Sequence, residues 1–124
     1  MAGPDHGGAL PADPPLEIGP RDLAEWRDAG APHAVLDVRE PWEVAICALD
    51  GAIALPLGRL LNGADEETVA PLPRDRPLVV LCHHGRRSLE ATLHLRSRGF
   101  ANAVNLAGGI DAWAVTVDPR TPRY

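Results

Sequence analysis

The sequence predicts a single α/β domain with a mostly parallel five-stranded sheet and helices on both of its faces. Its apolar residues form short continuous runs, which are typical of strands buried on both faces. Segments with the features of helices stand between these runs, so strands and helices alternate along the chain. The 124 residues are enough to bury one hydrophobic core.

The first half of the chain is expected to hold three strands. We expect them over residues 16–18, 34–38 and 52–55. Helices are expected from residue 19 to residue 30, over residues 39–44 and within residues 57–70. Gly30 ends the first of these helices, and Pro41 stands near the beginning of the second, where proline is well tolerated.

In the second half of the chain, an apolar run leads directly into a cysteine. A strand over residues 78–81 continues directly into Cys82, and a loop with one glycine joins it to a helix over residues 88–96. A fifth strand and a last short helix are expected over residues 103–106 and 110–113. We therefore predict a flexible leader, a folded domain and an irregular tail, over residues 1–15, 16–115 and 116–124.

Composition excludes several classes of function. The formal net charge is −5, and all 12 basic residues are arginines. The lack of lysine excludes Schiff-base and P-loop lysine chemistry, and the acidic balance argues against nucleic-acid partners. Two cysteines do not make a disulfide framework, and no apolar run or amino-terminal segment resembles a membrane span or secretory signal. We expect a cytoplasmic protein without a membrane partner.

Cys82 has the local setting of a nucleophile. It stands at the carboxyl end of a buried strand and faces the beginning of a helix, where backbone N–H groups converge. These donors and the helix dipole favour the thiolate over the thiol, and Arg86 and Arg87 act in the same direction. Ligand sites of parallel sheets lie at the carboxyl ends of the strands, so Asp37 is expected close to Cys82.

Other candidate residues have less specific settings. Cys47 is expected to be an inert, small apolar residue, because we expect no cationic group around it. Cys82, His83 and His84 lack the spacing of zinc ligands, so we predict no metal and no cofactor. Asp37 and Arg39 either serve the site or form an ion pair that fixes the loop, with Glu43 as a further partner. The three tryptophans are expected to be core and packing residues rather than ligand platforms: Trp26, Trp42 and Trp113.

Four short motifs together resemble rhodanese-like sulfurtransferases. Residues 82–88 match the C-x-x-G-x-R-S active-site loop, and residues 36–40, 51–57 and 105–113 resemble L-D-V-R-E, G-A-x-x-I-P-L and N-L-x-G-G-I-x-A-W. The motifs occur in family order, and the tail resembles the rhodanese domain fused to adenylyltransferases that activate sulfur-carrier proteins. One departure is Cys47-Ala48-Leu49-Asp50-Gly51, where many relatives have G-H-I-P-G. We expect that departure to affect the pocket rim.

The resemblance implies a sulfurtransferase that forms a persulfide on Cys82. The donor would be a small anion such as thiosulfate, and the acceptor would be a thiol, cyanide or a sulfur-carrier-type protein. The catalytic residue would be Cys82, supported by Asp37 and Arg39. The substrate-binding residues would be those of the loop: His83, His84, Gly85, Arg86, Arg87 and Ser88. Backbone N–H groups of this loop would surround the sulfur, as in an oxyanion hole.

Three other functions remain open. Cysteine phosphatases and arsenate reductases place arginine six positions after the cysteine, whereas here Ser88 is sixth and Arg87 is fifth. A non-enzymatic binding or regulatory module of the same fold commonly lacks the cysteine that this chain keeps. A redox sensor would need a resolving cysteine, so Cys47 would have to approach Cys82.

Overall fold

The computed structural model describes residues 14–62 and 66–124, so the predicted leader lies almost wholly outside the described residues. Within the described ranges, five strands form one sheet in the order β1-β5-β4-β2-β3, and every neighbouring pair is parallel. The strands are β1 (Glu17–Ile18), β2 (Ala34–Asp37), β3 (Ile53–Ala54), β4 (Leu78–Leu81) and β5 (Ala103–Leu106). The predicted α/β class and five-stranded parallel sheet are confirmed.

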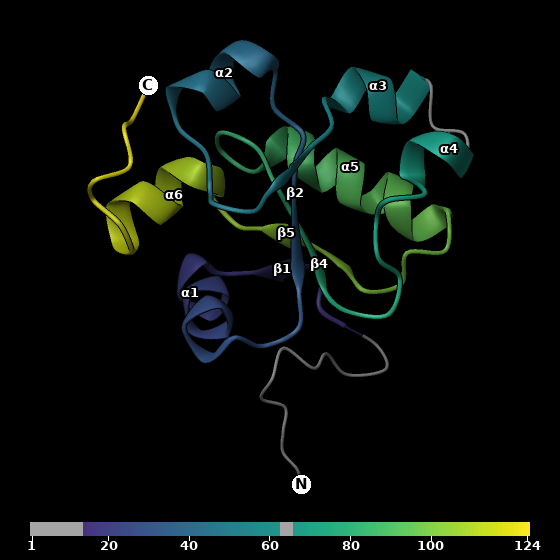
Figure 1. Ribbon diagram of the computed structural model, residues 1–124, viewed down its shortest axis with the longest axis horizontal. Helices are drawn as coiled ribbons and strands as arrows, with labels where there is room; N and C mark the ends of the chain where they lie inside the picture. The colour runs from purple at the N-terminus through teal and green to yellow at the C-terminus, as the bar shows by residue number, and fades with distance from the viewer. Residues whose placement is uncertain (1–13, 63–65) are drawn as a thin grey trace, which may run out of the picture.

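Helices cover both faces of this sheet (Figure 1). They are α1 (Pro20–Ala29), α2 (Pro41–Ile46), α3 (Leu57–Asn62), α4 (Glu66–Val69), α5 (Arg86–Ser97) and α6 (Gly109–Thr116). In Figure 1, α1 and α6 lie to one side of the strands, and α3, α4 and α5 lie to the other. Alternate residues of β4 enter the two cores: Val80 packs with α5, and Val79 packs with α1 and α6.

Local signals define the ends of the helices. Proline occupies the first turn of both α1 and α2, and the Gly19 N–H group donates a hydrogen bond to Asp22 Oδ2 at 2.9 Å. Gly30 ends α1 in a left-handed conformation with φ of 66°. The helix α5 begins at Arg86, two residues before the predicted start, because Gly85 already turns the chain with φ of 100°.

The central strand β4 is fully buried, as is its neighbour β5. All four residues of β4 are buried, and β4 pairs with β2 on one side and β5 on the other. The edge strands β1 and β3 are two residues long and pair on one side only. In the part of the chain that the structure describes, no helix has the length and apolar character needed to cross a membrane.

Candidate active site

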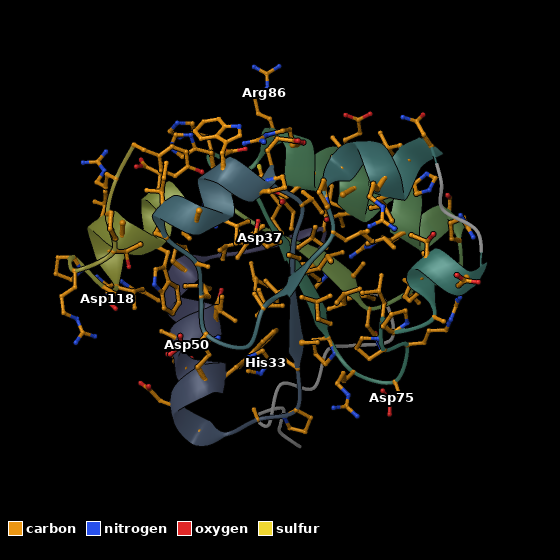
Figure 2. The ribbon with its side chains drawn as sticks, turned by 45° about the horizontal axis from the view of Figure 1, so that its top comes forward. His33, Asp37, Asp50, Asp75, Arg86 and Asp118 are labelled. Carbon is orange, nitrogen blue, oxygen red and sulfur yellow. The ribbon has the colours of Figure 1, made fainter. Side chains whose placement is uncertain are left out.

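The candidate site lies where β2 and β4 end at the same edge of the sheet. Asp37 is in register with Leu81, so Cys82 follows immediately beyond the last paired position. Figure 2 shows Asp37 inside the molecule, whereas Arg86 extends away from it into solvent. The topology therefore brings the end of β2 next to the cysteine loop, as the sequence predicted, because parallel neighbours end at one edge.

Backbone donors surround the sulfur of Cys82, a residue that is 1% exposed. Its Sγ accepts hydrogen bonds from the N–H groups of Gly85 at 3.1 Å and Ser88 at 3.3 Å. The left-handed conformation of Gly85 turns the loop back over the sulfur, and the first turn of α5 supplies the second donor. N–H groups directed at one sulfur atom favour a negative charge there.

A buried network of hydrogen bonds centred on Asn105 supports the cysteine loop. Asn105 Nδ2 donates to Glu17 Oε2 at 2.8 Å and to the Gly85 carbonyl oxygen at 3.1 Å. These two acceptors orient the amide, so Asn105 Oδ1 must accept the hydroxyl hydrogen of Ser88, whose Oγ is 2.5 Å away. Ser88 Oγ also lies 3.3 Å from Cys82 Sγ. This hydrogen-bond network thereby fixes the orientation of the Ser88 hydroxyl group, which contacts the sulfur.

The beginning of α6 holds the carbonyl groups of the cysteine loop. The N–H groups of Ile110 and Asp111 donate to the carbonyl oxygens of Cys82 at 2.9 Å and His83 at 3.1 Å. Gly109, with φ of 64°, packs so closely that an added Cβ would lie 2.5 Å from both carbonyl oxygens. A side chain at this position would therefore displace the loop that carries the sulfur.

Asp37 and Arg39 form a buried ion pair with an N–O distance of 2.7 Å, and their side chains are 1% and 0% exposed. Arg39 also donates to the backbone oxygens of Glu43 and Cys47 and to Tyr124 Oη. All of its N–H donors thus have acceptors, which favours the predicted alternative of an ion pair that fixes the loop. The expectation that no cation is near Cys47 is wrong, because Arg39 Nη1 lies 3.9 Å from Cys47 Sγ.

Arg87 contacts a carboxylate from another helix. Its Nη1 and Nη2 donate to Glu43 Oε1 at 2.6 Å and Oε2 at 2.8 Å, which makes a bidentate pair between α5 and α2. The hydrogen bonds from Arg87 outweigh the effect of burial and lower the pKa of Glu43 to about 2. The Arg87 side chain is 37% exposed, so it is partly accessible from solvent.

The two histidines of the loop and Tyr124 form one stack, with His83 in the middle. The ring centroid of His83 lies 3.9 Å from that of His84 and 3.9 Å from that of Tyr124. Burial, and after it the charge interaction with His84, lowers the pKa of His83 below its ordinary value. Trp42 meets Tyr124 edge-on and is 64% exposed, so its expected role as a core residue is wrong. Its helix, α2, buries Glu43 instead.

Two residues of this arrangement were not predicted from the sequence as site residues. Asn105 is a polar residue inside the apolar run of β5, a pattern that indicates a specific buried partner. Tyr124 is the only tyrosine of the chain and follows an irregular segment, which gave no signal of its contacts with the loop. In residues 14–62 and 66–124, no group of three or more His, Cys, Asp or Glu side chains is arranged to hold a metal ion.

Comparison with known proteins gives a consistent family and fold. Residues 19–116 match the model of the family described as "Rhodanese-like domain". The chain is 42% identical over 107 residues to the probable adenylyltransferase/sulfurtransferase MoeZ of Mycobacterium tuberculosis, a match that covers 86% of this chain and 26% of MoeZ. It is 37% identical over 106 residues to the adenylyltransferase and sulfurtransferase MOCS3-2 of Zea mays, covering 84% and 22%. The chain therefore spans about a quarter of the length of these relatives.

Solved structures show the same architecture. A rhodanese-related protein from Thermoplasma volcanium has a TM-score of 0.68 and 33% identity, covering 86% of this chain and 94% of that chain. The human single-domain sulfurtransferase TSTD1 has a TM-score of 0.71 and 25% identity, covering 82% and 97%. The fold of this chain is thus shared with solved structures that it covers almost from end to end.

Proposed function

Because this chain belongs to the rhodanese-like domain family, we propose that it is a sulfurtransferase that carries sulfane sulfur as a persulfide on Cys82. Its relatives include proteins named as sulfurtransferases, and its loop keeps a cysteine at the end of β4. The observation that carries the proposal is the pair of backbone N–H groups, from Gly85 and Ser88, directed at the buried Cys82 sulfur.

The proposed reaction has two steps. The Cys82 thiolate attacks the outer sulfur of thiosulfate, a new S–S bond forms, and the S–S bond of the donor breaks with release of sulfite. The terminal sulfur of the resulting persulfide is then attacked by an acceptor thiolate or by cyanide. The Cys82 thiolate leaves with the electron pair of its S–S bond, so the protein returns to its starting state.

The loop geometry supports a stabilising role for its backbone in both steps. Negative charge stays on sulfur throughout, first on Cys82 Sγ and then on the outer persulfide sulfur. The donors from Gly85 and Ser88 already contact Sγ, and the partly exposed side chain of Arg87 provides positive charge for an anionic donor. The remaining loop residues that we propose for substrate binding are His83, His84 and Arg86.

Other parts of the proposal concern the acceptor and the compartment. The relatives MoeZ and MOCS3-2 are named as combined adenylyltransferases and sulfurtransferases, which favours a protein acceptor such as a sulfur carrier for this chain as well. Both Cys47 and Cys82 are free thiols. The proposed chemistry needs Cys82 reduced, so we place the protein in the cytoplasm.

Thiocyanate production from thiosulfate and cyanide tests this function. We expect Cys82→Ser to abolish the activity, because serine cannot form a persulfide, and the matched variant Cys47→Ser to keep most of it. The intact protein mass after thiosulfate treatment should rise by one sulfur atom in the parent and in Cys47→Ser only. Thiocyanate production by Cys82→Ser at the parental rate would refute the proposal.

The same proteins distinguish sulfur transfer from phosphate chemistry. Arg87 stands five positions after Cys82 and is bound to Glu43, so we expect no hydrolysis of an aryl phosphate. Aryl phosphate hydrolysis that depends on Cys82 and exceeds sulfur transfer would assign the site to the phosphatases instead.

A further inference from the structure

We propose that Tyr124 is a positioning residue for the chemistry of Cys82: its hydroxyl group keeps the Glu43 carboxylate bound to Arg87, and Arg87 thereby stays where it attracts anions to the cysteine. The role in sulfur transfer rests on the proposed function, whereas the attraction of anions can be measured without it. The family match ends at residue 116, so it does not include this residue.

The Tyr124 hydroxyl group lies between two ion pairs. Its Oη accepts a hydrogen bond from Arg39 Nη1 at 2.9 Å and donates one to Glu43 Oε2 at 2.8 Å. The direction of each bond is fixed, because a guanidinium group only donates and the single hydroxyl hydrogen must therefore point to the carboxylate. The hydroxyl thus separates the Arg39 cation from the Glu43 carboxylate.

The Glu43 carboxylate has its acceptor positions filled. Oε1 accepts from Arg87 and from the Glu40 N–H group at 3.0 Å, and Oε2 accepts from Arg87 and Tyr124. Loss of the hydroxyl would leave Oε2 short of a donor and Arg39 Nη1 short of an acceptor, both in a largely buried setting. Rotation of the Glu43 carboxylate toward Arg39 would give both of these atoms a partner. It would also weaken the hydrogen bonds between Glu43 and Arg87.

The ring of Tyr124 has separate contacts that keep the tail in place. It stacks on His83 with an interplanar angle of 7°, and it meets Trp42 at a centroid distance of 6.1 Å. Phenylalanine would preserve these ring contacts and remove only the two hydroxyl bonds. The variant Tyr124→Phe therefore isolates the proposed role of the hydroxyl from the packing of the tail.

Arg87 lies in the cysteine loop as well as against Glu43. It stands directly before Ser88, whose N–H group donates to Cys82 Sγ at 3.3 Å. Hydrogen bonds from Arg87 to Glu43 outweigh its burial and raise the pKa of Arg87 above its ordinary value. Glu43 thus fixes a cation that lies within electrostatic reach of the Cys82 sulfur. An anionic reagent approaching Cys82 is attracted by this cation, whereas an uncharged reagent of the same size is not.

The test compares the alkylation of Cys82 by iodoacetate, an anion, and by iodoacetamide, which is uncharged. Both reagents transfer a substituted methylene group to the thiolate sulfur and release iodide. Peptide-resolved mass spectrometry measures the rate at Cys82 separately from that at Cys47. The proteins are the parent, Tyr124→Phe, Arg87→Ala, the double variant and Arg120→Ala. Arg120 pairs with Asp118 on the exposed surface of the same tail, so it is the matched control.

We expect Tyr124→Phe to lower the iodoacetate-to-iodoacetamide rate ratio about fivefold. Arg87→Ala should lower it at least as much, and the double variant should fall no further than Arg87→Ala, because the hydroxyl acts through Arg87. The ratio for Arg120→Ala should equal that of the parent. An unchanged ratio in Tyr124→Phe, or a loss in the double variant equal to the product of the single losses, would overturn the inference.

Sulfur transfer by the same proteins separates this inference from the proposed function. If thiosulfate is the donor, Tyr124→Phe should raise its KM severalfold with little change in kcat, since the binding of the anion is what changes. If the parent transfers no sulfur while the alkylation ratio behaves as expected, the proposed function fails and the positioning role of Tyr124 stands.

Discussion

Asn105 shows how a single side chain can connect the sheet to the sulfur. It is fully buried in β5, and its amide contacts Glu17, Gly85 and Ser88. Its amide nitrogen holds the Gly85 carbonyl, and its amide oxygen holds the Ser88 hydroxyl. Gly85 and Ser88 are the two residues whose N–H groups contact Cys82. The two N–H groups that contact the sulfur are therefore held in place by a residue of the sheet as well as by α5.

Replacement of this residue tests that anchor. We expect Asn105→Ala to lower the free energy of unfolding by about 2–4 kcal/mol, because it leaves buried polar groups without partners and creates a cavity. Urea denaturation measures the change. Asn102→Ala makes the same chemical change at a partly exposed position and should cost less than about 0.5 kcal/mol. Equal losses for the two variants would show that the buried amide contacts contribute nothing particular.

At the scale of elements, two helix beginnings meet at the cysteine loop. The helix α5 directs the Ser88 N–H group at the sulfur, and α6 directs two N–H groups at the carbonyl oxygens on the other side of the loop. The carbonyl groups of Cys82 and His83 are thus turned away from the sulfur, since their oxygens bond to α6. The close approach of Gly109 makes this arrangement possible.

Two glycines with the same backbone conformation allow the effect of backbone strain to be measured separately from the effect of a steric clash. Gly109 and Gly30 have φ of 64° and 66°, but an added Cβ would meet Cys82 and His83 carbonyls at Gly109 and nothing within 4 Å at Gly30. We expect Gly30→Ala to cost about 1 kcal/mol of stability and to leave sulfur transfer unchanged. Gly109→Ala should cost more and lower the transfer rate at least tenfold. Unfolding curves and thiocyanate assays of both variants measure these effects, and similar activities would contradict the role of α6.

At the scale of the whole molecule, one network of charges joins four segments. The end of β2 contributes Asp37 and Arg39, α2 contributes Glu43, α5 contributes Arg87, and the tail contributes Tyr124. Burial raises the pKa of Tyr124 to about 12, so its hydroxyl remains protonated and can donate to Glu43 at physiological pH. The network holds the tail, α2 and the cysteine loop together.

This network should make stability depend on pH through Glu43. Its pKa falls from 4.5 to about 2 on folding, so the native state is stabilised above pH 4.5, and this contribution is lost as the pH falls toward 2. The contribution is on the order of 3 kcal/mol for a shift of this size. We expect the difference in unfolding free energy between the parent and Glu43→Gln to be large at pH 7 and to shrink between pH 4.5 and 3.

Denaturation at a series of pH values measures this difference. The control is Glu25→Gln, which removes the same charge from the exposed surface of α1 and should leave the curve of the parent unchanged. A Glu43→Gln curve that stays parallel to that of the parent down to pH 3 would show that Glu43 does not carry the dependence.

The sequence alone determined the elements and the place of the cysteine. Continuous apolar runs such as residues 78–81 specified the strands. Gly30 marked the end of one helix because glycine tolerates a left-handed conformation, and Pro41 marked the beginning of another because its φ is fixed. These signals are local, so they can be recognised without knowing what packs against them. Because the carboxyl ends of parallel strands share one edge, the proximity of Asp37 to the cysteine loop also followed from the pattern.

Tertiary structure alone decided which side chains meet around the sulfur. Glu43 pairs with Arg87 across 44 positions, and Arg39 bonds to Tyr124 across 85 positions. Charged residues such as Arg39 and Glu43 are usually exposed, but here they are buried. Trp42 is a large apolar residue that would usually be buried, but here it is exposed. Such contacts depend on the angles at which α2, α5 and the tail pack over the sheet, and those angles arise from the whole core rather than from any one segment.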